Sequence, residues 1–179
     1  MNPSLRRMLA AGAMAVLTLL PPVSAAQRVP EDEVKAAVVA NLLAFVQWPP
    51  ETLAASRELR LCVTASTAVA AALGKLQSRQ VHGLPLVIRT VGSDADELIH
   101  CHAVLAGLPS AALMRAATAV QGRPVLLIGE GAGVLERGAM IGLNLEGGRV
   151  VFDVDLAALR KARLNASSKL LRLVRHLVE

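Results

Sequence analysis

Short apolar strands alternate with helical segments through the middle of this 179-residue chain. Parallel strands need a long crossover connection, usually a helix, so the alternation favours a mainly parallel sheet with helices on both faces. The expected fold class is therefore α/β, a three-layer α/β/α sandwich. The expected strands cover residues 59–64, 84–91, 102–106 and 124–128, and the helices between them cover 69–76 and 110–120, the latter with Ser110 as its N-cap.

The first element is expected to be an amphipathic helix over residues 31–47, with acidic residues in its first turn and Trp48-Pro49-Pro50 at its end. Its inward face is defined by four apolar residues at spacings of four, four and three: Val34, Val38, Leu42 and Phe45. Trp48 either closes the helix against the core or anchors a partner. Core packing is favoured, because a sole Trp usually fills space and finds one polar contact.

The hydrophobic period changes to alternation in the last third of the chain. Two alternating runs are joined by Gly147-Gly148, with Ile141, Leu143 and Leu145 in the first and Val150, Phe152 and Val154 in the second. Such runs with a short glycine-rich link predict a β-hairpin. An antiparallel C-terminal hairpin, residues 139–155, is therefore expected beside the parallel sheet.

The end of the chain is expected to form two helices, over 156–163 and 167–178, the second capped by Ser167. The second helix would turn four apolar residues inward: Leu170, Leu171, Val174 and Val178. Six basic residues are spread over the two helices: Arg160, Lys161, Arg163, Lys169, Arg172 and Arg175. A solvated helix face is the favoured interpretation of these charges, and a patch for an anionic membrane or a partner is the alternative.

The amino terminus has the layout of a secretory signal peptide, with Arg6 and Arg7 ahead of an apolar run over residues 8–20 and a small-residue stretch after it. The apolar run is shorter than the roughly 20 residues that span a bilayer. Cleavage after Ala25 or Ala26 is therefore expected, and an uncleaved anchor or a buried helix is the alternative.

Export and charge together limit the partners. With residues 1–26 as the signal peptide, residues 27–179 form one exported domain. The signal carries two of the 19 basic residues and none of the 14 acidic ones, so its removal lowers the formal charge from +5 to +3. That mild excess, in an exported protein, predicts no nucleic-acid partner.

Motifs for catalysis, metals or cofactors are weak. The triplet His100-Cys101-His102 with His82 could suggest a metal site, but a structural zinc site needs about four suitably spaced ligands. The glycine-rich loop over residues 129–133 misses the dinucleotide fingerprint, and its Glu130 would repel a phosphate. No catalytic residue, metal or cofactor is therefore expected, and the chain is not expected to be an enzyme.

Several blocks of the sequence, taken in order, resemble one family. They include the helix that ends in Trp48-Pro49, the Cys101-His102 pair ahead of a buried strand, and the run G-A-M-I-G-L-N-L from Gly138. In full, the blocks cover residues 34–49, 59–63, 81–87, 100–105, 138–145, 151–156 and 164–171. In this combination the chain is similar to the YfiR-like periplasmic domains over nearly its whole mature length.

The resemblance implies a periplasmic α/β domain, often dimeric, that binds the periplasmic part of an inner-membrane signalling protein. In the best understood case the partner is a diguanylate cyclase, which is repressed, so that cyclic di-GMP output and biofilm growth are held low. A sensor kinase is the other partner that the resemblance allows. A periplasmic small-ligand binding module and a redox-sensing accessory domain remain as alternative functions.

The chain also departs from the pattern of the family. Asp155 stands where the family often has Asn, and Val38 and Val39 stand where the first helix often carries aromatic residues. Some members have a second cysteine pair near positions 135 and 142, which are Leu135 and Gly142 here. The loop before the hairpin must therefore be held by packing alone or respond differently to redox state.

Cys62 and Cys101 are the only cysteines, and an even number in an oxidising compartment argues for a bridge. They lie on or beside the first and third expected strands, which are neighbours in a doubly wound sheet. A disulfide is therefore expected, and two buried thiols are the alternative. A strained bridge would be a candidate redox switch.

The hairpin is the expected partner surface, because an antiparallel edge can add a strand from another chain. The residues assigned to this contact are Ile141, Leu143, Asn144, Arg149 and Phe152. A homodimer would compete for the same edges. The ligand-binding alternative instead needs a pocket at the carboxyl ends of the parallel strands, around residues 64–66 and 107–110.

Overall fold

The computed structural model describes residues 30–64, 67–92, 94–107 and 110–179. The predicted signal peptide and its cleavage site at Ala25 or Ala26 lie outside the described residues. Of the helices that the structure describes, none is both long and apolar enough to cross a bilayer.

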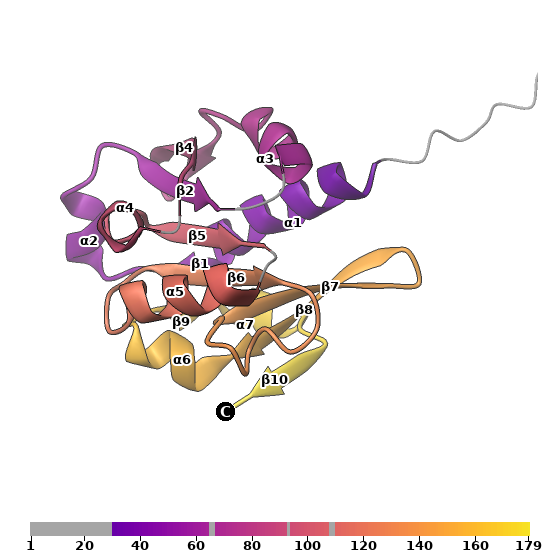
Figure 1. The fold of residues 1–179 in the computed structure, drawn as a ribbon. Coiled ribbons are helices and arrows are strands. Elements are labelled where there is room, and N and C mark those ends of the chain that lie inside the picture. The colour runs from indigo at the N-terminus through magenta and orange to yellow at the C-terminus, as the bar shows by residue number, and fades with distance from the viewer. Residues whose placement is uncertain (1–29, 65–66, 93, 108–109) are drawn as a thin grey trace, which may run out of the picture.

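An eight-stranded sheet forms the centre of the described part of the chain, in the order β10-β8-β7-β6-β5-β2-β4-β3 (Figure 1). Its strands are β2 (Leu59–Val63), β3 (Gln80–Val81), β4 (Leu84–Thr90), β5 (Ala103–Ala106), β6 (Leu126–Glu130), β7 (Ile141–Glu146), β8 (Arg149–Asp155) and β10 (His176–Val178). Two further short strands, β1 (Val46–Gln47) and β9 (Asn165–Ala166), pair with each other.

The sheet is parallel from β4 through β2, β5 and β6 to β7, and antiparallel pairs lie toward both edges. In the predicted hairpin, β7 and β8 pair from Ile141 with Val154 to Glu146 with Arg149. The mixed α/β fold class is confirmed. The central strands are confirmed within one or two residues at most ends.

Helices pack on the sheet. They are α1 (Glu31–Phe45), α2 (Pro50–Ala54), α3 (Thr67–Gly74), α4 (Ala95–Leu98), α5 (Ser110–Val120), α6 (Leu156–Lys161) and α7 (Ser168–Leu171). Helices α1 and α3 pack on each other, as do α4 and α5 (Figure 1). The crossover from β2 to β4 runs through α3, and the crossover from β5 to β6 runs through α5, as the alternation predicted.

Helix α1 forms as expected but turns a different face inward. Its fully buried residues are Ala36, Val39, Ala40, Leu42 and Leu43. Of the predicted face, Leu42 is buried, whereas Val34, Val38 and Phe45 are only partly buried. The helix is apolar on so many sides that the spacing of its largest residues did not define the buried face. It also ends at Phe45, because the next two residues form β1.

The predicted helix over residues 167–178 is wrong. Ser167 does cap a helix, since its Oγ accepts the backbone N–H of Leu170 at 3.3 Å, but that helix, α7, ends after one turn. Residues 176–178 then form β10, which pairs in parallel with β8. An open side of β8 supplied backbone partners that a longer helix would have left unused, so tertiary pairing prevailed over local periodicity. Val178, predicted to face inward, is 47% exposed.

The core is aliphatic, as the scarcity of aromatic residues requires. Leu43, Leu61, Leu73, Leu105 and Ile128 come from α1, β2, α3, β5 and β6, and each is almost fully buried. Trp48 is 5% exposed, which confirms its prediction as a core residue. Burial of this continuous layer stabilises the sandwich through the removal of apolar surface from water.

Candidate functional site

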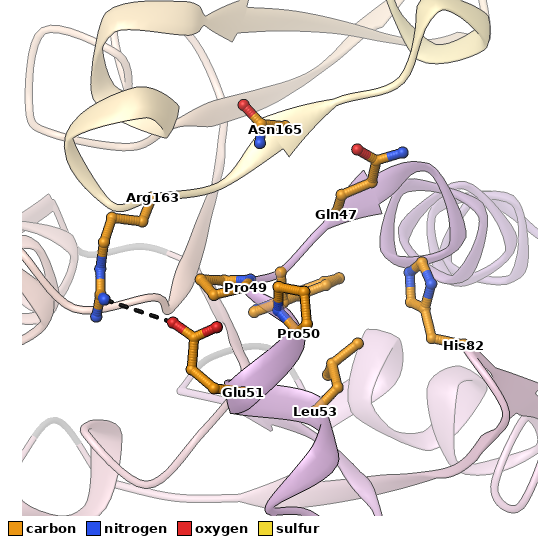
Figure 2. Close-up of a pocket in the computed structure, with 9 residues that line it drawn as sticks. Gln47, Pro49, Pro50, Glu51, Leu53, His82, Arg163 and Asn165 are labelled. Carbon is orange, nitrogen blue, oxygen red and sulfur yellow. Dashed lines mark ion pairs between the residues drawn. The ribbon is translucent and has the colours of Figure 1, made fainter.

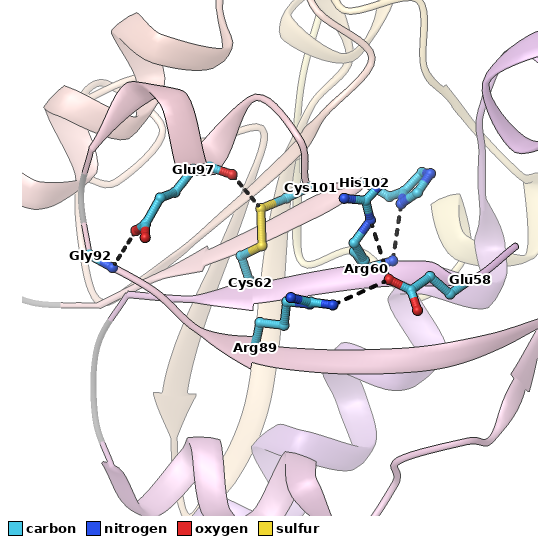
Figure 3. Close-up of a disulfide and its surroundings, with 8 residues drawn as sticks. All are labelled: Glu58, Arg60, Cys62, Arg89, Gly92, Glu97, Cys101 and His102. Atoms are coloured by element: carbon cyan, nitrogen blue, oxygen red, sulfur yellow. Dashed lines mark hydrogen bonds and ion pairs between the residues drawn. A yellow bond between two sulfur atoms is a disulfide. The ribbon is translucent and has the colours of Figure 1, made fainter. Parts of the chain in front are cut away.

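A disulfide joins Cys62 to Cys101, as predicted (Figure 3). Cys62 lies in β2, and Cys101 lies two residues before β5, the strand that pairs with β2. Their Cα atoms are 6.0 Å apart, which is an ordinary separation for a bridge. The bridge is buried and crosses between the two strands at the centre of the sheet, so it ties the start of β5 to β2.

His102, next to the bridge, is a buried hydrogen-bonding centre with 4% exposure (Figure 3). Its Nδ1 accepts the backbone N–H of Arg60 at 3.0 Å, so the proton of the neutral ring is on Nε2. Nε2 then donates to Ser56 Oγ at 2.9 Å, and that hydroxyl donates to the carbonyl oxygen of Thr52 at 2.9 Å. Burial first, and the charge of Arg60 second, lower the pKa of His102 below its usual value.

Trp48 connects this centre to a surface cleft. Its indole Nε1 donates to the backbone oxygen of His102 at 3.1 Å. Its ring meets the ring of His82 edge-on, with centroids 5.7 Å apart. His82 is itself anchored, because its Nε2 lies 2.9 Å from the carbonyl oxygen of Leu43.

The cleft has a volume of about 700 Å³ (Figure 2). It is lined by Gln47, Trp48, Pro49, Pro50, Glu51, Leu53, His82, Arg163 and Asn165. His82 precedes β4 and Trp48 bonds the residue before β5, so the cleft lies near the amino ends of the parallel strands. The ligand-binding alternative placed its pocket at the opposite ends of the strands, where residues 65–66 and 108–109 lie outside the described part.

Two residues on the rim of the cleft have an uncommon backbone conformation. His82 and Arg163 have positive φ angles of 52° and 57°, values that side chains other than glycine rarely adopt. Arg163 extends toward Glu51, with its Nη1 3.8 Å from Oε1, and both side chains are largely exposed (Figure 2). An exposed pair of this kind contributes little stability, so it does not by itself account for the strained backbone of Arg163.

A second polar cluster fastens the carboxyl-terminal segment to the hairpin. Asp153 of β8 is 9% exposed and accepts hydrogen bonds from Asn144 Nδ2 at 3.0 Å and Arg175 Nε at 2.9 Å. Arg175 also pairs through Nη2 with Asp153 and through Nη1 with Glu146. The solvated position predicted for Arg175 is therefore wrong, because its guanidinium satisfies a buried carboxylate.

Of the five residues predicted for partner contact, some are buried and others reach the surface. Ile141, Leu143 and Phe152 point into the core and are at most 9% exposed, so the folded domain does not offer these side chains to a partner. Asn144 is half-buried against Asp153, and Arg149 is exposed at the end of the hairpin. A partner role for Asn144 and Arg149 stays a prediction. The expected free edge of the hairpin is also partly covered, by β10 along residues 153–155.

The glycine-rich loop packs closely against strands β6 and β7. A Cβ on Gly129 would lie 2.9 Å from Val134 Cβ, and one on Gly142 would lie 2.7 Å from Val134 Cγ2. Val134, 3% exposed, thus fills the space that the two glycines leave on β6 and β7. This packing holds the loop at the positions where some family members were expected to carry a second cysteine pair. Glu130, which follows Gly129, pairs with Lys35 at 3.6 Å.

Among the described residues, no group of three His, Cys, Asp or Glu side chains could hold a metal ion. Cys101 is in the bridge and His102 is bonded through both ring nitrogens. Sequence reasoning did not find Ser56, Arg60 or Asp153 as members of buried polar clusters. Their partners are 9 to 46 residues away along the chain, and no local pattern carries that information.

These features define a disulfide-stabilised mixed α/β domain with a single buried bridge, a kind of construction typical of exported proteins. Within that class, the chain belongs to the YfiR/HmsC-like family, whose sequence pattern matches residues 32–175. Members of this family are periplasmic regulators of diguanylate cyclases and are not known enzymes.

The fold also occurs in a solved structure, that of a conserved domain protein from Vibrio cholerae O1 biovar El Tor strain N16961. The two share 13% sequence identity with a TM-score of 0.54 over 82% of this chain. The chain spans 60% of the length of that protein. At this identity the likeness concerns the fold alone. No curated protein matches the chain.

Proposed function

We propose that this protein is a periplasmic regulator that binds and represses an inner-membrane diguanylate cyclase and so lowers cyclic di-GMP output. The observation that carries the proposal is membership of the YfiR/HmsC-like family, whose members regulate such enzymes. The predicted signal peptide supports a periplasmic location, where the protein would meet the periplasmic part of its partner. A sensor kinase is the alternative inner-membrane partner.

The hydrogen bonds of the buried ionisable side chains support a role in protein binding. His102 is bonded to Ser56 and Arg60, and the carboxylate of Asp153 is bonded to Arg175. These two groups therefore hold the fold together, as expected in a rigid binding domain, and they are poorly placed for acid–base catalysis.

The hairpin tip, residues 144–151, is the surface that we propose for the cyclase. Beyond Leu143 strand β7 no longer pairs with β6, and before Asp153 strand β8 does not pair with β10. The tip therefore projects beyond the rest of the sheet (Figure 1). It carries exposed Leu145, at 48%, together with the exposed charge of Arg149.

The test is to delete the gene in the producing bacterium and measure cyclic di-GMP. Deletion should raise the level, and the full chain should restore it. Leu145→Asp should fail to restore it, because a charge would disrupt an apolar contact. Met114→Asp, at a side chain that is 56% exposed on α5, is the matched control and should restore it fully. An unchanged level after deletion in every growth condition would overturn the cyclase proposal.

A homodimer is part of this proposal because the family resemblance implies one. Its measurement is the mass of the purified domain by sedimentation over a range of concentrations. A monomer at all concentrations would remove the dimer from the proposal and leave the cyclase contact intact.

Small-ligand binding is a second candidate function, favoured by the cleft. Its apolar floor of Trp48 and Leu53 and the strained His82 and Arg163 on its rim suit a small molecule with an apolar body and an anionic group. Thermal unfolding with a panel of carboxylates and phosphates tests this. A shift that Arg163→Ala removes supports the ligand, and no shift with any compound argues against it.

A further inference from the structure

The two edges of the sheet differ in how far their backbone groups are covered. At the β3 edge, Gln77 Oε1 accepts the backbone N–H of Ile88 at 2.9 Å, and Ser78 and Arg79 exchange backbone hydrogen bonds with Leu86. The chain before β3 therefore covers the backbone of β4 and leaves it few groups to offer. This is how proteins commonly protect an edge against pairing with other chains.

The β10 edge has no such cover within the described residues. Strand β10 pairs only with β8, and all three of its residues are exposed. Leu177 is 42% exposed and Val178 is 47% exposed, and Leu173 nearby is 64% exposed. An edge with apolar side chains and open backbone groups is a template for an added strand.

The direction of the open backbone groups follows from the way β8 pairs with β7. The N–H of Asp155 donates to the carbonyl oxygen of Met140 at 2.9 Å. The backbone groups of Asp153 and Asp155 therefore face β7, and those of Phe152 and Val154 face β10. Because His176 lies beside Asp153 in the parallel register, the backbone groups of His176 and Val178 face β8, and those of Leu177 face outward. Proline at residue 177 would therefore remove an outward donor and leave the pairing with β8 in place.

The excess of basic residues near β10 favours an added strand that is acidic. Residues 156–179 contain six Lys or Arg and one Glu, whereas residues 27–155 contain 11 basic and 13 acidic residues. These last residues gather at the β10 end of the molecule (Figure 1). Four of the basic side chains are exposed and have no carboxylate partner among the described ion pairs: Arg160, Lys161, Lys169 and Arg172.

We propose that the outer edge of β10 binds an extended, acidic segment of a partner protein by strand addition. The proposal rests on the proposed function, since it gives the same protein partner a second contact, beside the one at the hairpin tip. The added strand would pair with the outward backbone groups of Leu177, while its carboxylates would face the exposed basic side chains of this end of the chain, Arg172 among them. A second copy of the chain fits less well, because two basic ends would then face each other.

The probes are short synthetic peptides that alternate valine with glutamate, and the same peptides with lysine in place of glutamate. Binding to the full mature chain is measured by fluorescence anisotropy, and the amide of Leu177 is followed by hydrogen exchange. The glutamate peptide should bind and protect this amide, and the lysine peptide should not bind. Leu177→Pro should weaken binding by about tenfold, and Arg172→Glu by severalfold.

The matched control is Arg89→Glu, at an exposed arginine on the covered edge of the sheet, which should leave binding unchanged. Thermal unfolding of each variant separates lost binding from lost folding. Equal binding of both peptides, or full binding by Leu177→Pro, would overturn the proposal. So would self-association that Leu177→Pro abolishes, or binding to phosphatidylglycerol vesicles in place of the peptide. Repression of the cyclase by Leu177→Pro at the wild-type level would overturn this proposal and leave the proposed function standing.

Discussion

Trp48 donates its indole N–H to the backbone oxygen of His102, and the same oxygen accepts the N–H of Leu126. One carbonyl thus joins the floor of the cleft to strands β5 and β6, one residue away from the disulfide. A change in the bridge would therefore reach the cleft through a single peptide unit.

Replacing both cysteines, Cys62→Ser with Cys101→Ser, should lower the free energy of unfolding by about 3 to 4 kcal/mol. The bridge closes a loop across a separation of 39 residues, and its loss gives the unfolded chain that conformational freedom back. Urea unfolding of the variant beside the oxidised wild type measures the difference. Equal midpoints for the two proteins would contradict this assignment of the bridge.

Gly142→Ala should destabilise the domain by about 1 to 3 kcal/mol, because the new Cβ would meet Val134 Cγ2 at 2.7 Å. Gly74→Ala is the matched control. It places a Cβ in open space at the end of α3 and should be neutral or slightly stabilising. Thermal unfolding of both variants checks this, and similar melting temperatures for the two would refute the packing role of Val134.

The stability of the protein should fall as the pH drops below about 6.5. Burial lowers the pKa of His102 in the folded state, so the unfolded chain binds this proton at a higher pH than the folded chain does. The stabilisation is complete above the unfolded pKa and is lost as pH falls from there toward the lower folded pKa.

The control for this pH dependence is His102→Asn, whose amide oxygen can still accept the N–H of Arg60 but does not titrate. Its free energy of unfolding, measured in urea between pH 8 and pH 5, should change less steeply than that of the wild type. Parallel curves for the two proteins would show that His102 does not contribute to the slope.

Arg175→Ala should cost about 1 to 3 kcal/mol of stability, since it leaves the buried carboxylate of Asp153 with only Asn144 as a side-chain partner. It should also speed hydrogen exchange at Val178, whose N–H faces β8. Arg149→Ala, at an exposed arginine of the same hairpin, should change neither quantity. An unchanged exchange rate in Arg175→Ala would separate the Asp153 cluster from the docking of β10.

The sequence predicted the centre of the fold well, because the patterns there are local. Buried strands such as Ala103–Ala106 are short apolar runs, and the hairpin alternates about its glycine link. Asp155 Oδ1 accepts the N–H of Ala158 as an N-cap, a role that the Asn of other family members can also fill. Local signals of this kind are legible without any knowledge of tertiary contacts.

The rest depended on contacts between distant parts of the chain. Helical spacing relates four apolar residues near the end of the chain: Leu170, Leu171, Val174 and Val178. Val178 nevertheless lies in a strand, because β10 pairs with the open side of β8. Likewise, His102 and Ser56 carry no mark of each other in the sequence. The disulfide could be predicted because the chain has just two cysteines. The cleft and the Asp153 cluster could not be predicted from the sequence.

The packing of Val134 against Gly129 and Gly142 has a consequence for the way the chain matures. Because that loop is closed without sulfur, the two cysteines have only each other as partners within the chain. A second cysteine pair would allow other disulfide connectivities, and non-native disulfides need an isomerase to be rearranged. This chain has no wrong intramolecular pairing to correct, so an oxidant alone suffices to complete its covalent structure.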